Sequence, residues 1–92
     1  MKYILKSSPK FRKSIKRIIK SKNYKHSEFL KVINTLLEGK KLEAKYKNHK
    51  LFGEYENCFE CHMQNDILLV YYYIEKELVL YAVDIGTHSE LF

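Results

Sequence analysis

The spacing of apolar residues changes once along the chain, and this change limits the possible folds more than any other feature of the sequence. In the first 40 residues, apolar side chains such as Phe11, Ile15 and Ile18 recur every three or four positions, which is the period of an amphipathic helix. From residue 58 onward, β-branched and aromatic residues form short runs that are typical of strands. The sequence therefore predicts that most helices precede most strands.

Start and stop signals bound the N-terminal elements. Residues 2–6 predict a short strand, and Ser8-Pro9 then has the N-cap and first-turn signature of a helix. We expect this helix to reach about Lys22. A second helix is expected over residues 27–38, ended by Gly39.

The C-terminal half predicts three consecutive strands, after a stretch at 40–56 that has no clear period. The strands are expected at residues 58–63, 67–74 and 78–83, and their short connections favour an antiparallel meander. The order of elements becomes β-α-α-β-β-β. It predicts an α+β fold, an antiparallel sheet with the two N-terminal helices packed on one face, in a single domain over residues 1–92.

Charge is divided between the two halves of the chain. Residues 1–50 carry 16 Lys/Arg against 3 Asp/Glu, a balance of +13, and residues 51–92 carry 1 against 8, a balance of −7. A segment with this much positive charge attracts polyanions such as nucleic acids. The alternative is that the lysines form a solvated surface without a partner. No run approaches the roughly 18 apolar residues of a membrane span, and the first residues do not have the pattern of a targeting signal. We therefore expect a cytoplasmic protein without a membrane partner.

The stretch CFECH at residues 58–62 has the spacing of a c-type haem attachment site. Its two cysteines lie three positions apart in an expected strand, so their side chains point to opposite faces and cannot share one haem or one zinc ion. A four-ligand zinc site would also need His49 or His88. We therefore expect no metal and no cofactor, two free thiols, and a His62 that is available for another role.

Separate blocks of the C-terminal half are similar to one known family. The blocks are Asn48-His49-Lys50-Leu51 with Gly53, Glu60-Cys61-His62 with Asp66-Ile67-Leu68-Leu69-Val70-Tyr71, and Gly86-Thr87-His88-Ser89-Glu90-Leu91-Phe92. In this order they resemble the YafQ-like branch of the RelE/ParE superfamily of bacterial type II toxins. The resemblance extends over roughly the whole chain. It implies a RelE-like fold and a ribosome-dependent endoribonuclease that cuts translated mRNA. It also implies a co-encoded antitoxin, which the basic half of the chain predicts to be small and acidic.

The resemblance also implies which residues form the site. Metal-free RNA cleavage needs a base for the 2′-OH, an acid for the leaving 5′-oxygen and positive charge near the transition state. Imidazole can serve either proton role near neutral pH. We expect His88 to be the acid and His62 or Asp66 to be the base, with His49 orienting or stabilising the scissile phosphate. The expected RNA contacts are Lys45, Lys47, Lys50, Ile67 and Phe92.

Two positions depart from the family pattern. Asp84 stands on the last expected strand, where related toxins usually carry an arginine, and an acid there would repel the phosphate. Either Lys50 substitutes in part for the missing cation, or Asp84 pairs with His88 and favours its protonated form. Ile67 stands where tryptophan is frequent, which removes a stacking surface. Phe92 either stacks on an RNA base or plugs the sheet as a hydrophobic residue.

Other functions remain compatible with the same residues. One is a toxin fold whose catalysis is weak or lost and which acts mainly through antitoxin binding, an alternative that Asp84 favours. Another is a gyrase-poisoning, ParE-like activity on the same fold. A third is a non-enzymatic basic module that binds nucleic acid.

Overall fold

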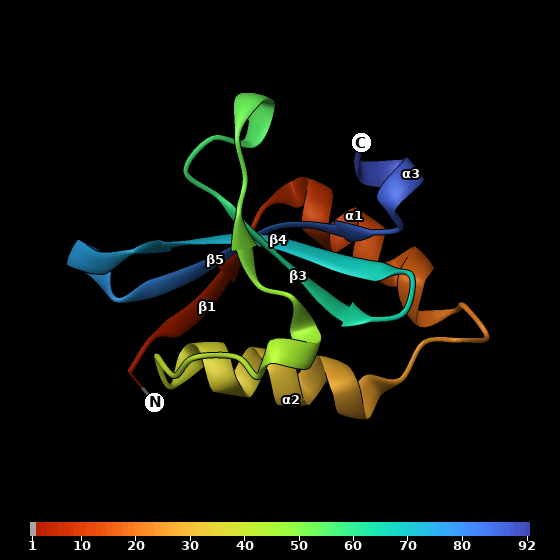
Figure 1. Cartoon of the computed structure of the whole chain (residues 1–92), viewed down its shortest axis with the longest axis horizontal. Coiled ribbons are helices and arrows are strands. Elements are labelled where there is room, and N and C mark those ends of the chain that lie inside the picture. The colour runs from red at the N-terminus through yellow and green to blue at the C-terminus, as the bar shows by residue number, and fades with distance from the viewer. Residues whose placement is uncertain (1) are drawn as a thin grey trace.

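The helices and strands follow the expected order, with a short strand and a short helix added (Figure 1). The computed structural model describes residues 2–92. The sheet has five strands in the order β1-β5-β4-β3-β2. The elements are β1 (Ile4–Ser7), α1 (Pro9–Ile19), α2 (His26–Leu37), η1 (Ala44–Tyr46), β2 (His49–Lys50), η2 (Gly53–Tyr55), β3 (Phe59–Gln64), β4 (Ile67–Ile74), η3 (Glu75–Glu77), β5 (Val79–Gly86) and α3 (His88–Leu91), where η marks a 3-10 helix.

The sheet is mixed and not antiparallel throughout. The predicted meander is confirmed, because β3 pairs with β4 and β4 pairs with β5 in antiparallel fashion. β1, however, runs parallel to β5, with Ile4 opposite Val79 and Ser7 opposite Ala82. Parallel neighbours need a long crossover connection, and here most of the chain lies between the two strands. β5 also continues to Gly86, beyond the predicted end at residue 83.

The first helix begins where the sequence predicts and ends earlier. Ser8 is the N-cap and its side chain accepts a hydrogen bond from the backbone N–H of Phe11, with Pro9 in the first turn, as expected for such a start. The helix stops at Ile19 and not near Lys22, because the next backbone N–H groups bond three residues back and tighten the turn. The apolar period ends at the same point.

The second helix ends in a Schellman motif at Gly39, as the sequence predicts. The backbone N–H groups of Gly39 and Lys40 donate to the carbonyls of Leu36 and Thr35, which is the bonding pattern of this motif. Gly39 has a φ of +72°, and a Cβ atom there would lie 3.0 Å from the side chain of Lys2. The positive φ favours glycine at this position, and a Cβ atom would also require the flexible Lys2 side chain to shift.

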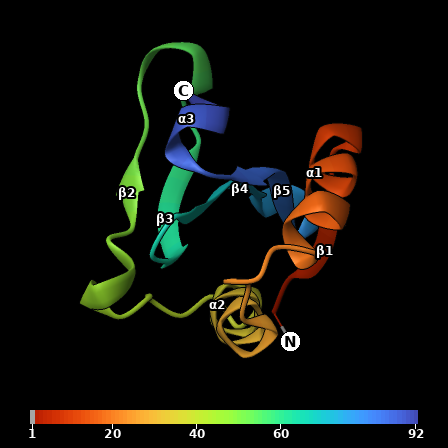
Figure 2. The same ribbon diagram turned by 90° about the vertical axis from the view of Figure 1, so that its right-hand side faces the viewer.

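Both N-terminal helices contribute to the larger of two core clusters, on one face of the sheet. In Figure 2, α2 lies below the strands, α1 lies beside β5 and β1, and α3 lies on the side opposite to α2. The cluster on the helix side includes Phe11, Ile18, Val32, Ile33, Leu36, Cys61, Leu69, Tyr71, Leu80 and Ile85. The smaller cluster on the other face consists of Cys58, Leu68, Val70 and Leu91. Within residues 2–92, no helix has the length and apolar character that a membrane span requires.

The two cysteines lie in different clusters, which confirms that they face opposite sides of the sheet. Cys61 is fully buried on the helix side and Cys58 is nearly buried on the other side, and both are free thiols. Burial raises the pKa of both thiols, that of Cys61 to about 12. Neither thiol is therefore a ready nucleophile or metal ligand in the native state.

We expect both thiols to be unreactive toward Ellman's reagent at pH 8 in the native protein. The physical reason is their low exposure and their small thiolate fraction at that pH. Adding denaturant should release two reactive thiols per chain, measured by absorbance. One equivalent that reacts rapidly without denaturant would contradict the burial of Cys58 or Cys61.

Candidate active site

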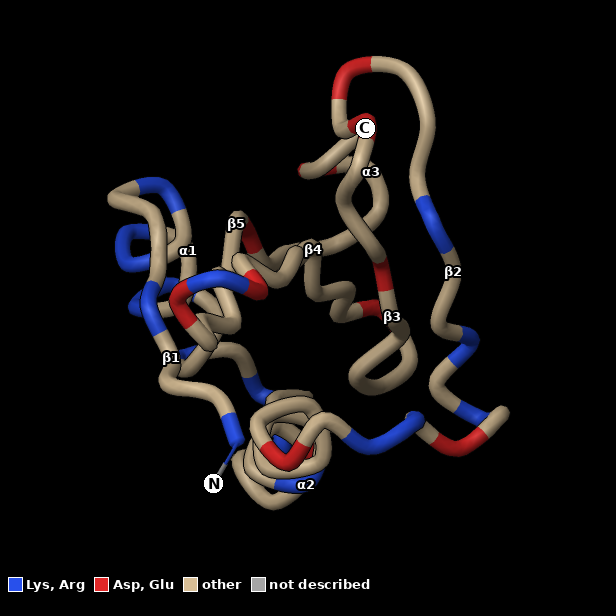
Figure 3. Tube along the Cα trace, turned by 90° about the vertical axis from the view of Figure 1, so that its left-hand side faces the viewer, with Lys and Arg blue, Asp and Glu red and all other residues tan. Residues whose placement is uncertain are grey.

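A row of paired residues crosses four strands and carries two buried carboxylates. His49 on β2 is opposite Glu60 on β3, Glu60 is opposite Val70 on β4, and Val70 is opposite Asp84 on β5. Directly paired residues point to the same face of a sheet, so these side chains share the face that the N-terminal helices leave uncovered. Glu60 is 4% exposed and Asp84 is 3% exposed. In Figure 3, these acidic strands lie between basic residues on α1 and basic residues near β2.

Two histidines surround the buried Glu60 carboxylate. The Nε2 atoms of His49 and His62 lie 3.4 Å and 3.7 Å from Glu60 Oε1, and their ring centroids are 6.4 Å apart. The Nδ1 atom of His49 lies 2.8 Å from the carbonyl oxygen of Lys47. A carbonyl oxygen can only accept, so Nδ1 is the donor of this hydrogen bond. Both nitrogens of His49 therefore face acceptor oxygens. Glu60 Oε2 is buried and has no hydrogen-bond partner within the described chain.

Local sequence explains how Glu60 and His62 come together. They are two positions apart on β3 and so point to the same face. A β-bulge follows His62, and beyond it the side chain of Gln64 accepts from the backbone N–H of Lys25 at 2.8 Å and donates to the carbonyl of Asn23. These bonds join the β3–β4 turn to the connection between α1 and α2.

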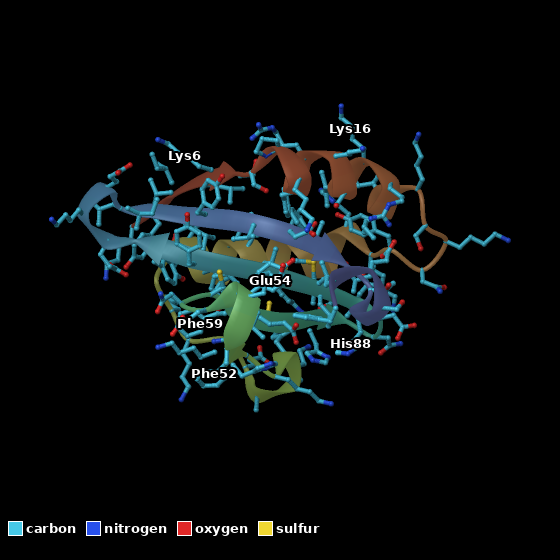
Figure 4. All side chains as sticks on the ribbon, turned by 90° about the horizontal axis from the view of Figure 1, so that it is seen from above. Lys6, Lys16, Phe52, Glu54, Phe59 and His88 are labelled. Carbon is cyan, nitrogen blue, oxygen red and sulfur yellow. The ribbon has the colours of Figure 1, made fainter. Side chains whose placement is uncertain are left out.

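His88 lies at the start of α3, at the same end of the sheet as His62. Leu68 pairs with His62 on one side and with Gly86 on the other, and His88 follows Gly86 by two residues. The His88 ring contacts the Phe92 ring, with centroids 5.3 Å apart, rather than the other two histidines. Figure 4 shows the His88 label at the C-terminal helix α3, to which His88 belongs. Phe92 is 53% exposed, so it is not a plug on the sheet.

A capping box formed by Thr87 and Glu90 stabilises the start of α3, and the Glu90 carboxylate has a shifted pKa. Glu90 accepts from the backbone N–H of Thr87 at 2.8 Å, and the Thr87 hydroxyl accepts from the backbone N–H of Glu90. Glu90 also pairs with Arg17 of α1. The backbone hydrogen bond first, and then the charge of Arg17, lower the pKa of Glu90 below its ordinary value of 4.5.

We expect acid to loosen α3. The stabilising effect of Glu90 is fully present above about pH 4.5 and is lost as the pH falls through its lowered folded-state pKa. The ring contact between His88 and Phe92 should weaken over that range, as measured by NOEs in NMR spectra. Core resonances of Leu69 serve as the control for general unfolding. A Glu90→Ala variant should show the weakened contact already at neutral pH, and a contact that persists in this variant contradicts the prediction.

Several predicted RNA contacts line one hollow next to this face. The hollow has a volume of about 840 Å³. It is lined by the predicted site residues Lys45, Lys47, His62, Asp66 and Ile67, and also by Lys22, Lys25 and Thr87. Asp66 lies exposed in the turn before β4. Ile67 is 5% exposed and packs in the core, so it presents little surface to a base.

Two expectations about charge are wrong. Lys50 is opposite Phe59, which stacks on Tyr71 at the helix-side core. Lys50 therefore leaves the sheet on the face opposite to His49 and cannot substitute for an arginine there. Asp84 does not pair with His88. Its carboxylate accepts from the backbone N–H of Ile85 at 2.8 Å and lies 3.5 Å from the ammonium of Lys10.

Sequence reasoning overlooked Glu60 as a site residue. The available signal was a carboxylate two positions before His62 in an otherwise apolar strand, which places both on one face. Sequence alone gives no sign of Lys10, which reaches Asp84 from a distant helix. Within residues 2–92, no group of three His, Cys, Asp or Glu side chains has an arrangement that could hold a metal ion.

Comparisons with known proteins agree with the fold and the blocks. A family model described as the bacterial toxin of type II toxin-antitoxin systems, YafQ, matches residues 3–92. The crystal structure of a metal-bound toxin from Helicobacter pylori is 37% identical with a TM-score of 0.88, over 98% of this chain and 99% of that chain. YafQ of Escherichia coli in complex with DinJ is 24% identical with a TM-score of 0.84 over 98% of both chains, which shows the shared fold.

A further match is shorter. A protein of Haemophilus influenzae that is named for YafQ is 35% identical over 51 residues, which are 55% of this chain and 50% of that protein. The chain thus spans about half the length of this relative in the match.

Proposed function

The chain belongs to the YafQ family of bacterial type II toxins, and on that premise we propose that it is a ribosome-dependent endoribonuclease that cleaves translated mRNA. The substrate is mRNA in the ribosomal A site, and the location is the cytoplasm. The observation that carries the proposal is the buried carboxylate of Glu60 between two imidazoles on an open sheet face. A carboxylate this close to two imidazoles biases where the ring protons lie and so suits acid–base chemistry.

In the proposed reaction His62 is the base. Glu60 faces Nε2 of His62 at 3.7 Å, which favours the proton on Nε2 and leaves the lone pair on Nδ1. That nitrogen takes the proton of the 2′-OH, and the 2′-oxygen attacks the adjacent phosphorus. Glu60 acts as a positioning residue, because its side chain is buried and Oε1 is the atom that faces both rings. His62 is favoured over Asp66 because the Asp66 side chain is exposed and accepts no hydrogen bond that would orient it within residues 2–92.

In the same reaction His88 is the acid. Its imidazolium protonates the 5′-oxygen as the bond between phosphorus and that oxygen breaks, which leaves a 2′,3′-cyclic phosphate and a 5′-hydroxyl. His49 is assigned the orienting or charge-stabilising role toward the phosphate, from its place beside Glu60 on the same face as His62. This chemistry needs no metal ion. The exposed Phe92 ring beside His88 is a platform on which a base can stack.

Translation dependence tests the proposal directly. The purified protein is added to a reconstituted translation system, and transcript ends are mapped by primer extension. We expect discrete cuts within the reading frame, and no cuts in the same transcript without its start codon. Growth arrest with intact mRNA would overturn the proposal in favour of gyrase poisoning. RNA binding without cuts would overturn it in favour of a binding module or an inactive toxin.

We also propose that a co-encoded antitoxin neutralises the protein. The complex of Escherichia coli YafQ with DinJ supports this for a protein of the same fold. The basic first half of this chain, with a balance of +13 over residues 1–50, favours a small and acidic partner. Co-expression with the neighbouring reading frame should restore growth, and a partner that is basic throughout would contradict the charge argument.

A further inference from the structure

Lys10 is held over the buried Asp84 by two contacts. Its ammonium lies 3.5 Å from Asp84 Oδ2 and donates to the Tyr55 hydroxyl at 3.4 Å. The hydrogen bond to Tyr55 and then the charge of Asp84 raise the pKa of Lys10. An ammonium has three donors, so one donor remains for a ligand. The Lys10 side chain is 65% exposed and a ligand can reach it from solvent.

The backbone around Lys10 is fixed to the strand that carries Asp84. The Ser8 hydroxyl donates to the carbonyl of Val83 at 2.6 Å, and the Ser8 backbone N–H donates to the carbonyl of Ala82. The pairing of β4 with β5 is irregular at this point, since Val70 is opposite Asp84 while the next residue is opposite Ala82. These hydrogen bonds therefore fix the start of α1 against the β5 bulge. Because Lys10 follows Ser8 by two residues, its backbone is fixed relative to Asp84 as well.

Lys10 of α1 supplies positive charge next to Asp84, at the position where the sequence led us to expect an arginine on β5. The chain has two arginines, Arg12 and Arg17. Arg12 donates to the backbone and hydroxyl oxygens of Ser7, and Arg17 pairs with Glu90. Neither has the buried anchor that orients the Lys10 ammonium. Asp84 is thus neutralised by its own neighbour and does not present an unpaired charge to RNA.

The position of Lys10 relative to the other site residues suits a phosphodiester. Asp84 and Glu60 are two strands apart on one row, with only Val70 between them, a spacing of about 10 Å. An RNA strand that crosses this row therefore passes from the histidines beside Glu60 to the ammonium beside Asp84. Tyr55, the other partner of Lys10, contacts the Phe92 ring edge-on at 5.7 Å, and Phe92 contacts His88.

We propose that Lys10, oriented by Asp84 and Tyr55, is a binding site for a backbone phosphate of the RNA strand that crosses the sheet face. This inference rests on the proposed function and adds a subsite to it. Lys10 is the residue that touches RNA, and Asp84 is a positioning residue that acts through it. With an aspartate at position 84, the positive charge at this place comes from Lys10 on the first helix and not from an arginine on β5.

The salt dependence of RNA binding tests the subsite without cleavage. The probe is a single-stranded oligoribonucleotide of about ten nucleotides, 2′-O-methylated throughout. We expect Lys10→Met to bind about tenfold more weakly at low salt, and its slope of log affinity against log salt to be shallower by about 0.7. Lys10→Arg should retain binding, and Asp84→Asn should have an intermediate affinity.

Lys16→Met is the matched control, because Lys16 lies on the same helix with its side chain directed away from the strands (Figure 4). We expect its affinity and slope to equal those of wild type. Equal melting temperatures for Lys10→Met and Lys16→Met exclude a purely structural effect. Binding by Lys10→Met that matches wild type, or a wild type that does not bind the probe, would overturn the inference.

Cleavage by the same proteins separates this inference from the proposed function. If wild type does not cut translated mRNA, the proposed function fails, while the salt slopes still decide the role of Lys10. If wild type cuts and Lys10→Met cuts as fast, the inference fails alone. We expect Lys10→Met to cut at least tenfold more slowly than Lys16→Met.

Discussion

A Glu60→Gln variant is expected to cleave translated mRNA about 10²- to 10⁴-fold more slowly than wild type. Glutamine has nearly the same shape, but it is neutral and can turn an N–H toward the Nε2 atoms of His49 and His62. The proton of His62 would then move to the nitrogen that must accept the 2′-OH proton. In other enzymes, replacement of the buried acid beside a catalytic histidine by its amide has cost about 10⁴-fold in rate for this reason.

Stability and pH dependence show whether Glu60 acts through the histidines. One Glu60 oxygen has no partner, so the neutral side chain should change the free energy of unfolding by no more than about 1 kcal/mol, as measured by denaturant titration. The acid limb of the pH–rate profile, where the rate falls as the base becomes protonated, should shift in the variant. Wild-type cleavage by Glu60→Gln, or a rate loss explained by unfolding, would contradict the role assigned to Glu60.

A His88→Ala variant is expected to lose about 10²- to 10⁴-fold in cleavage rate, because the leaving 5′-oxygen would depart without a proton. Binding of the uncleavable RNA should stay within about twofold of wild type, since His88 contributes no fixed charge contact. His26→Ala is the matched control. His26 lies at the start of α2 and contacts Tyr24 and Phe29 rather than the sheet face, and its variant should cleave at the wild-type rate.

The basic limb of the pH–rate profile provides the second measurement. This fall in rate at high pH should be present in wild type and absent in His88→Ala, because it reports loss of the proton from the general acid. If His88→Ala retains the basic limb and the rate, another residue is the acid. If His26→Ala loses activity as well, the loss reflects the fold rather than proton transfer.

Local signals account for most of the fold that the sequence predicts. The N-cap at Ser8 and the αL residue Gly39 are properties of a few neighbouring residues, so they are readable without knowledge of the rest. The meander follows from connections too short for any other path. By contrast, β2 has 2 residues and α3 has 4, and neither length displays a period. The parallel pairing of β1 with β5 depends on contacts between segments near the two ends of the chain.

The candidate site shows the same division. His49, His62 and His88 stand in recognisable blocks, and the structure brings the first two together around one carboxylate. The contact of Lys10 with Asp84 joins positions 74 residues apart, and a one-residue irregularity in β5 decides which face Asp84 occupies. No local pattern carries that information. The catalytic and RNA-binding roles themselves stay predictions until the variants are measured.

The parallel pairing of the first strand with the last has a consequence for biosynthesis. Ile4 leaves the ribosome early, but its partner Val79 is among the later residues to be made. The same delay applies to Lys10 and Asp84. Non-local pairings of this kind slow folding, so a growing chain passes through a period in which its helices exist while the sheet edge is open. We therefore expect a nascent chain that ends before β5 to be harmless to the ribosome producing it.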